Sequence, residues 1–215
     1  MILGPKILLG RLWHCWLRFT GRRVIYIDCG ANVGTVLEEK VREYPSSEYF
    51  AFEANPDLID QILAVKRKYP KTAIEVYNKA VWTEDSNVDF FLSRENSRGE
   101  TVTDGSTLLS GKVPINPGSG RIDYDQPVQV ESVDFSKWIL HNFRPQDYIC
   151  LKMDIEGAEY AVLGKMLEDD SIRYINKAYV EFHYTDSGQL NSISKDTHED
   201  IRSRVGKATK LLVWH

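Results

Sequence analysis

The chain has 215 residues, of which 42% are hydrophobic and 27% charged, and its formal net charge is −4 at pH 7. This composition suits one globular domain with a full core. The acidic balance argues against a protein that coats DNA or RNA, because neutralising phosphates needs a basic surface. No apolar run approaches the roughly 18 residues that a membrane-spanning helix needs.

Residues 1–23 predict a basic amphipathic helix that precedes the main domain. The stretch holds five basic residues and no acidic one. Leu8, Leu12, Cys15, Trp16 and Phe19 fall on one helical face, and Arg11, His14, Arg18 and Arg22 on another. One interpretation is a helix packed on the domain that follows, where it could cover a ligand pocket. The other is a helix that contacts a membrane surface, which would make a cytoplasmic protein membrane-peripheral.

From Val24 onward strand-like and helical segments alternate, which predicts one domain over residues 24–215. Such alternation is typical of a doubly wound, mostly parallel sheet with helices on both faces. The predicted strands are Val24–Asp28, Tyr49–Glu53, Ala73–Trp82, Asp147–Asp154, Lys177–Tyr184 and Lys210–His215. The predicted helices between them are Thr35–Tyr44, Asp57–Tyr69 and Glu159–Leu167. Cys29 and Cys150 lie in two of these strands, and the odd count of three cysteines predicts free thiols in a reducing compartment.

Residues 93–125 interrupt this alternation with a stretch rich in Gly, Ser, Asn and Pro. A long polar loop inside a compact domain is usually functional or disordered, and we expect this one to cover the substrate. Its flanks, Asn87–Ser93 and Pro127–Asp134, resemble two strands that pair with each other.

The segment "VIYIDCGANVGT" ends the first strand in a glycine-rich turn. In open parallel sheets, ligands bind beyond the carboxyl ends of the strands, where the strand order reverses. A dinucleotide site would need G-x-G-x-x-G, but Asn32 and Thr35 stand where the second and third glycines belong, and no Walker lysine follows. These departures argue against a phosphate ligand.

An acid at the first strand end and a second acid on the next strand indicate a different ligand. Asp28 suits an ammonium group, and Glu53, about 20 residues beyond the turn, can accept the hydroxyl protons of a ribose. Together they predict S-adenosylmethionine, and the alternative is a tight turn with a stray acid. Asp28 is predicted to contact the ammonium group and Glu53 the ribose. The other predicted cofactor contacts are Gly30, Ala31 and Asn32 around the tail, Gly34 in the same turn, Asp154 near the methyl group, and Ala54 and Asn55 near the adenine.

The segment "YICLKMDIEGAEY" carries a second group of charged residues at a strand end. Alternation places Lys152 and Asp154 on the same side of the strand. A lysine among acids is costly to bury without partners, which favours a site. Glu156 and Glu159 could instead cap a helix or pair with Lys152. On the next strand, alternation also places Glu181 and His183 on one side.

Lys152, Asp154, Glu181 and His183 are therefore the predicted catalytic residues. Asp154, Glu181 and His183 each remain a candidate for the base. The carboxylates of Asp154, Glu156 and Glu181 suit Mg²⁺, but nothing in the sequence fixes a coordination geometry, and we predict no metal.

The sequence resembles the FkbM-type S-adenosylmethionine-dependent methyltransferases. Segments typical of that family, "IDVGANVG", "FEP-x-P", "K-x-DVEG-x-E" and "E-x-H", have counterparts here in the same order: "IDCGANVGT", "FEANP", "LKMDIEGAEY" and "VEFH". "GSTLL" is similar to a serine motif in the family's mid-chain insertion. The resemblance covers Val24 to His183 and leaves out the first helix and the tail beyond Tyr184.

This resemblance implies a Rossmann-like, seven-stranded class I methyltransferase fold and O-methylation of a sugar, glycan or similar small molecule. An RNA ribose 2′-O-methyltransferase is an alternative, with Arg94, Arg98, Lys112 and Arg121 as its only track of cations. A second alternative is an inactive module that binds the cofactor and recruits a partner. The sequence indicates neither a DNA partner nor an oligomeric state.

Overall fold

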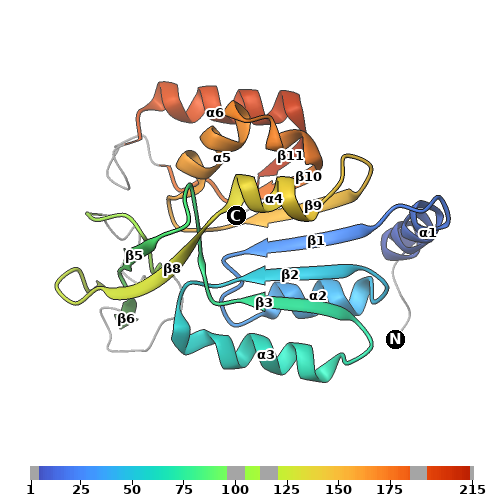
Figure 1. Cartoon of the computed structure of the whole chain (residues 1–215), viewed down its shortest axis with the longest axis horizontal. Coiled ribbons are helices and arrows are strands. Elements are labelled where there is room, and N and C mark those ends of the chain that lie inside the picture. Colours follow the sequence, from blue (N-terminus) through green and yellow to red (C-terminus); the bar gives the residue numbers. More distant parts are fainter. Residues whose placement is uncertain (1–4, 96–104, 112–120, 185–192, 214–215) are drawn as a thin grey trace.

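A parallel sheet forms the centre of the computed structural model, which describes residues 5–95, 105–111, 121–184 and 193–213 (Figure 1). Six strands lie in the order β11-β10-β9-β1-β2-β3, and every neighbouring pair is parallel. Their bounds are β1 Val24–Cys29, β2 Glu48–Phe52, β3 Ala73–Tyr77, β9 Tyr148–Met153, β10 Ile175–Val180 and β11 Lys210–Val213. The strand order reverses between β1 and β9, where a ligand crevice is expected.

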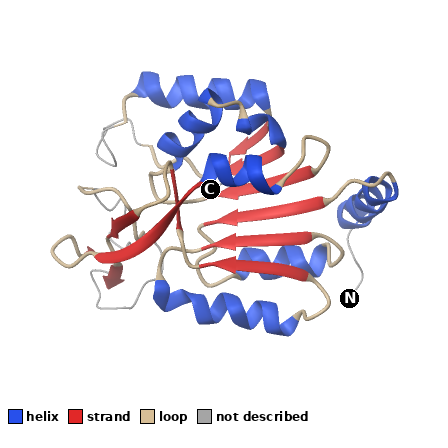
Figure 2. Cartoon of the chain, in the orientation of Figure 1, coloured by secondary structure: helices blue, strands red, loops and turns tan. Residues whose placement is uncertain are grey.

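Helices cover both faces of this sheet (Figure 2). On one face, α2 (Thr35–Glu43) and α3 (Ile59–Lys68) pack on a cluster that includes Tyr49 and Ala51. On the other, α4 (Phe135–Asn142), α5 (Glu159–Glu168) and α6 (Lys195–Ala208) pack on a larger cluster that includes Phe50 and Phe52. The alternation along β2 thus sends successive side chains to opposite layers. Short 3₁₀ helices, Pro56–Leu58 and Ser171–Tyr174, complete the helical elements.

The predicted doubly wound parallel sheet is confirmed, with two differences in the strands. The described residues form six strands of the central sheet rather than seven. The single strand expected over Ala73–Trp82 is wrong: β3 ends at Tyr77, and β4 (Ala80–Trp82) leaves the sheet. At this break the side-chain amide of Asn78 donates to the backbone oxygens of Glu53 and Ala54, which ties the chain after β3 to the chain after β2.

A smaller β layer lies beyond the carboxyl ends of the central strands (Figure 1). β8 (Val128–Asp134) pairs in parallel with β4 and in antiparallel with β5 (Asn87–Phe90), so the predicted pairing of the insertion's flanks is confirmed. Two further strands pair with each other, β6 (Ser93–Glu95) and β7 (Arg121–Ile122). Much of the predicted substrate loop, residues 96–104 and 112–120 with Arg98 and Lys112, lies outside the described residues.

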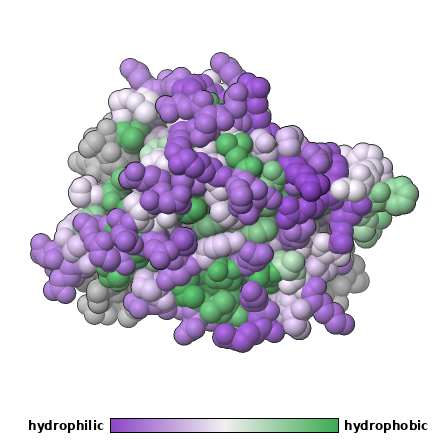
Figure 3. Space-filling model, in the orientation of Figure 1, coloured by the Kyte–Doolittle hydropathy of each residue, from purple (hydrophilic) through white to green (hydrophobic). Residues whose placement is uncertain are grey.

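The first helix, α1 (Pro5–Phe19), lies at the opposite end of the sheet, beside the amino ends of the strands (Figure 1). It therefore does not cover a ligand pocket at the carboxyl ends. Its orientation is also the reverse of that of an ordinary amphipathic helix. Leu17 is fully buried, whereas the apolar face predicted from the sequence is exposed: Leu8, Leu12, Cys15, Trp16 and Phe19. Hydrophobic atoms are visible at that end of the space-filling view (Figure 3).

All three cysteines are free, and Cys29 and Cys150 are buried as predicted. Within the described ranges, no helix has both the length and the apolar character needed to cross a membrane.

Candidate active site

The glycine turn after β1 brings two strand ends into contact. Gly30 has φ +78°, and a Cβ added there would lie 1.8 Å from the backbone oxygen of Asp154. Only glycine leaves room for so close an approach. Asn32 and Gly34 also have positive φ, and Gly34 leads directly into α2. The turn therefore passes directly against the chain that leaves β9.

Glu53 follows β2 and is held in place by the backbone around it. One carboxylate oxygen accepts from the N–H of Asn32 at 2.7 Å, and the other from the N–H of Asn55 at 2.8 Å. The side chain is buried, and this burial raises its pKa despite the two hydrogen bonds. The acid thus fixes the glycine turn relative to β2 while each oxygen keeps a second acceptor position.

A cavity lies where these segments meet at the carboxyl edge of the sheet. Its empty volume, which includes space open to solvent, is about 620 Å³. Among the predicted cofactor residues, Gly30, Asn32, Glu53, Ala54 and Asp154 line it. The wall also contains residues that were not predicted to bind a ligand, namely Phe52, Lys79, Ala80, Val81, Phe90 and Ile155.

Asp28 and Lys152 do not line this cavity. They are register partners on β1 and β9, and the lysine nitrogen lies 3.3 Å from an Asp28 oxygen. Lys152 also lies 3.3 Å from Asp154 and donates to the backbone oxygen of Gly30 at 2.6 Å. Burial alone would lower the pKa of Lys152, but the two aspartates raise it. This buried cation therefore connects the glycine turn to the segment after β9.

Some of the remaining predicted residues have structural contacts or lie beside the cavity. The side chain of Asn55 accepts from the N–H of Asp57 and caps the short 3₁₀ helix there. Ala31 belongs to the apolar layer under α2, and Gly34 approaches Val65 and Ile62 of α3.

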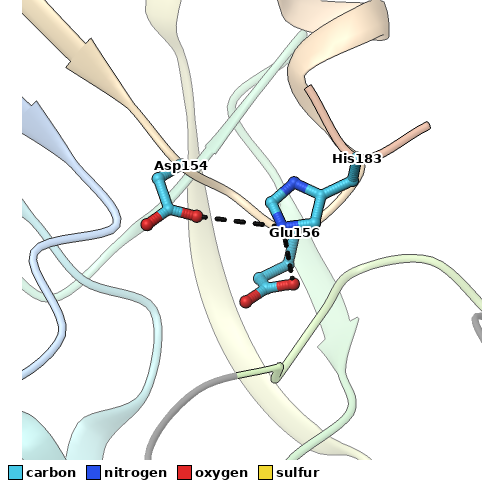
Figure 4. A group of neighbouring side chains, drawn as sticks. All are labelled: Asp154, Glu156 and His183. Atoms are coloured by element: carbon cyan, nitrogen blue, oxygen red, sulfur yellow. Dashed lines mark ion pairs between the residues drawn. The ribbon is translucent and has the colours of Figure 1, made fainter. Parts of the chain in front are cut away.

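The second predicted group converges beyond the ends of β9 and β10 (Figure 4). His183 Nε2 lies 3.0 Å from Glu156 and 4.0 Å from Asp154, while its Nδ1 contacts Glu159. β10 ends at Val180, so Glu181 and His183 follow the strand rather than belonging to it. The expected placement of Lys152 and Asp154 on one side of β9 is confirmed by their contact.

Electrostatics in this group favour a charged imidazole over a free base. Burial alone would lower the pKa of His183, but hydrogen bonds to Glu156 and Glu159 raise it to about 10. Burial also raises the pKa of the nearby Glu181, to which the negative charges of Asp154 and Glu156 contribute. In this arrangement both His183 nitrogens have carboxylate partners, which disfavours its predicted role as the catalytic base.

The described part of the insertion, Gly105–Gly111, contacts the site directly. The N–H of Gly105 donates to a Glu156 side-chain oxygen at 2.9 Å, and the Thr107 hydroxyl donates to the Glu156 backbone oxygen at 2.8 Å. Gly105, Ser106 and Leu108 also line the cavity. The "GSTLL" motif was the only signal in the sequence for these contacts. Sequence alone did not show that Glu156 would be their partner, since they join residues about 50 positions apart.

The comparison with protein families agrees with this geometry. Residues 28–210 match the family model described as "Methyltransferase FkbM domain". The chain belongs to the FkbM methyltransferase family. No curated protein and no solved structure matches the chain. The family match extends beyond Tyr184, so the expectation that the tail lies outside the resemblance is wrong.

Proposed function

We propose that this FkbM methyltransferase uses S-adenosylmethionine, as a class I enzyme, to methylate a hydroxyl of a sugar, glycan or similar small molecule. The observation that carries the proposal is the Glu53 carboxylate in the cavity wall. Both of its oxygens are oriented by backbone N–H groups. An oriented, buried carboxylate with free acceptor positions suits the paired hydroxyls of a ribose.

Other groups in the wall fit the rest of such a cofactor. Asn32 lines the cavity, and its side-chain oxygen is buried without a hydrogen-bond partner in the described part of the chain. An ammonium group could supply that missing donor. Asp28, the residue predicted for this role, is paired with Lys152 instead. We therefore assign Asp28 and Lys152 a positioning role, in which they hold the glycine turn through the Gly30 carbonyl.

Methyl transfer requires alignment and the removal of one proton. Held by Glu53 and Asn32, S-adenosylmethionine would supply a methyl group bound to a sulfonium, and transfer of that group to the acceptor oxygen would release a neutral thioether. Holding the reacting atoms in line can contribute about 7–11 kcal/mol. Asp154 is the predicted base that lines the cavity, so we assign it the acceptor's proton; a placed base typically adds about 10²–10⁴-fold.

The insertion supports a small acceptor over a long polymer. Gly105, Ser106 and Leu108 form part of the wall, so we expect the segment that carries them to limit the size of the acceptor. Loops held on a rigid scaffold commonly set specificity. The composition, with a net charge of −4, also favours an uncharged acceptor such as a sugar.

Calorimetric titration with S-adenosylhomocysteine tests the cofactor assignment. We expect stoichiometric binding to the wild type, and no comparable binding of NAD. A Glu53→Gln variant should bind about 10-fold or more weakly, because one backbone N–H and a ribose hydroxyl lose their acceptor. The matched control is Glu168→Gln, which changes an exposed acid at the far end of α5 and should leave the affinity unchanged.

A 2′-deoxy analogue of S-adenosylhomocysteine separates recognition of the ribose from support of the turn. The wild type should bind this analogue more weakly than the parent compound, and Glu53→Gln should lose most of that preference. If the variant weakens both ligands equally, Glu53 only supports the turn. If the wild type binds neither ligand, the proposed cofactor is wrong.

A further inference from the structure

We propose that Asp154, Glu156 and His183 bind a divalent transition-metal ion beside the cofactor cavity. Each residue offers one ligand atom, and the three atoms lie within 4.8 Å of one another (Figure 4). Ligands about 2.1 Å from a shared ion lie roughly 3.0–3.4 Å apart in octahedral or tetrahedral geometry. The His183–Glu156 distance of 3.0 Å already matches, and the His183–Asp154 distance of 4.0 Å needs a small side-chain movement.

The residues behind these three resemble the outer shell of a metal site. Glu159 is fully buried and contacts Nδ1 of His183. A carboxylate in that position fixes the ring orientation and directs the Nε2 lone pair toward a metal, as in many carboxylate–histidine–metal arrangements. Glu156 is oriented in the same way, because Gly105 binds one of its oxygens and the other faces His183. The His183 ring and the Glu156 carboxylate, which supply two of the three ligand atoms, are thus each held by a different partner.

The local charge also favours a cation. Four carboxylates gather here, those of Asp154, Glu156, Glu159 and Glu181. The neighbouring Lys152 is shared between Asp28 and Asp154. A divalent ion would balance the charge of two carboxylates.

The ligand types narrow the choice of ion. An imidazole nitrogen with two carboxylate oxygens suits Mn²⁺, Co²⁺ or Zn²⁺ better than Mg²⁺, which prefers oxygen ligands alone. Three protein ligands would leave open coordination positions, as catalytic sites do. Asp154 and Glu156 both line the cavity, so those positions can face an acceptor. An ion there would lower the pKa of the acceptor hydroxyl. This catalytic role rests on the proposed function, whereas the binding of the metal ion does not.

Direct metal titration of protein stripped with EDTA tests the site. We expect one equivalent of Mn²⁺ or Zn²⁺ to bind in calorimetry, and one equivalent of Co²⁺ to give a visible spectrum typical of nitrogen and oxygen ligands. His183→Gln and Asp154→Asn should weaken binding at least about 100-fold, and Glu159→Gln about 10–100-fold through the ring orientation. His141→Gln, which changes an exposed histidine of α4, is the control.

Parallel titrations with S-adenosylhomocysteine keep the two proposals apart. If none of the three ions binds stoichiometrically to the wild type, the proposed metal site is wrong, even if the cofactor analogue binds. Equal metal binding by wild type and His183→Gln would overturn it as well. The wild-type Co²⁺ spectrum provides a test that does not depend on how well any variant folds, because a spectrum of thiolate ligation would place the ion elsewhere.

A separate observation, the reversed orientation of α1, supports a second proposal: we infer that this helix binds an anionic lipid surface. Six large apolar side chains of α1 are exposed, and Phe19 is 91% accessible; the others are Leu8, Leu9, Leu12, Trp13 and Trp16. Trp13 and Trp16 stack with their ring centroids 4.9 Å apart. Tryptophan on an apolar helix face beside arginines is typical of helices that lie in a membrane interface.

The positive charge of residues 1–23 favours an anionic lipid as the partner of this face. Residues 1–23 contain five basic residues and no acid. Arg11 and Arg18 bind backbone oxygens of the domain, which leaves their positive charge unneutralised, whereas Arg23 pairs with Glu48 and Asp147. An anionic bilayer would accommodate the apolar face and attract this positive charge.

Vesicle sedimentation tests this surface with the full chain. We expect binding to vesicles that contain phosphatidylserine, weaker binding to pure phosphatidylcholine, and loss of binding at high salt. Replacing Leu12, Trp16 and Phe19 together with Gln should abolish it, whereas Leu140→Gln, at an exposed apolar position of α4, should not. No sedimentation with anionic vesicles would overturn the inference. So would a concentration-dependent dimer that the triple variant disrupts, because the face would then bind a second copy.

Discussion

The two edges of the central sheet use their charged side chains in different ways. At the carboxyl edge, charged groups turn inward and pair with one another, as Lys152 does with Asp28 and Asp154. At the amino edge, the arginines of α1 turn inward but bind backbone carbonyls, and the apolar side chains turn outward. Inward-facing charge therefore connects the glycine turn to the segment after β9 at one edge and orients a helix at the other.

The carbonyls at the end of α2 explain the orientation of α1. Arg11 donates to the backbone oxygens of Arg42 and Glu43, which belong to the last turn of that helix. The final carbonyls of a helix have no partners within it and carry partial negative charge. The arginine thus satisfies groups that no apolar side chain could satisfy. The orientation of a helix can therefore depend on the unpaired backbone carbonyls of its neighbour as well as on its own apolar face.

A pair of glycine substitutions separates steric contact from backbone conformation at the two edges. Gly30 and Gly21 have nearly the same φ, +78° and +80°, but only Gly30 faces a backbone atom at 1.8 Å, and Gly21 has nothing within 4 Å. We expect Gly30→Ala to reduce the free energy of unfolding by about 4 kcal/mol and to abolish binding of S-adenosylhomocysteine. Gly21→Ala should cost about 1 kcal/mol. Urea denaturation measures both, and equal costs would show that the Asp154 contact is unimportant.

The buried lysine gives the next largest expected effect. Lys152→Met leaves Asp28 buried without its cation, so we expect a loss of about 3 kcal/mol in the free energy of unfolding. Adding Asp28→Asn should restore more than half of this loss, because the unpaired charge disappears. The exposed control, Lys195→Met, breaks a pair on α6 that spans 3.8 Å and should cost less than about 0.5 kcal/mol. No recovery in the double variant would contradict the pairing role.

The sequence predicted the parts of the fold that depend on local pattern. Alternating apolar runs predicted the parallel sheet and its helices, and the pairing of the insertion's flanks followed from the same signal. The break at Asn78 was missed because the residues around it continue an apolar strand pattern. At the break, the Asn78 side chain contacts the turn after β2, and local pattern does not encode such a contact.

The candidate site was predictable to a similar degree. The strand-end positions of Glu53 and Asp154 followed from the alternation, and both line the cavity. The pairing of Asp28 with Lys152 was missed because it depends on the register between β1 and β9. The contacts that place His183 between Glu156 and Glu159 were missed for the same reason, since they form beyond the ends of two different strands.

The pH dependence of stability should be a smaller effect, and measuring it tests only the amino edge of the sheet. His14 of α1 lies against the rings of Tyr26, Tyr44 and Tyr148. Burial, and then the nearby charge of Lys177, lower its pKa from 6.5 to about 4. The unfolded chain therefore binds more protons than the folded chain between these two values. The stability contributed by the neutral ring is complete above pH 6.5 and is lost as the pH falls toward 4.

The expected change in the free energy of unfolding follows from these two pKa values of His14. Between pH 7 and pH 5 the shift corresponds to about 2 kcal/mol at most, and water that still reaches the ring reduces this to about 1 kcal/mol. His14→Phe keeps an aromatic ring against the tyrosines but cannot be protonated, so the stability of this variant should fall less over the same range. His141→Phe, on the exposed side of α4, should behave as the wild type does. Urea denaturation at both pH values measures the difference, and parallel behaviour of wild type and His14→Phe would mean that the amino edge does not sense pH through this ring.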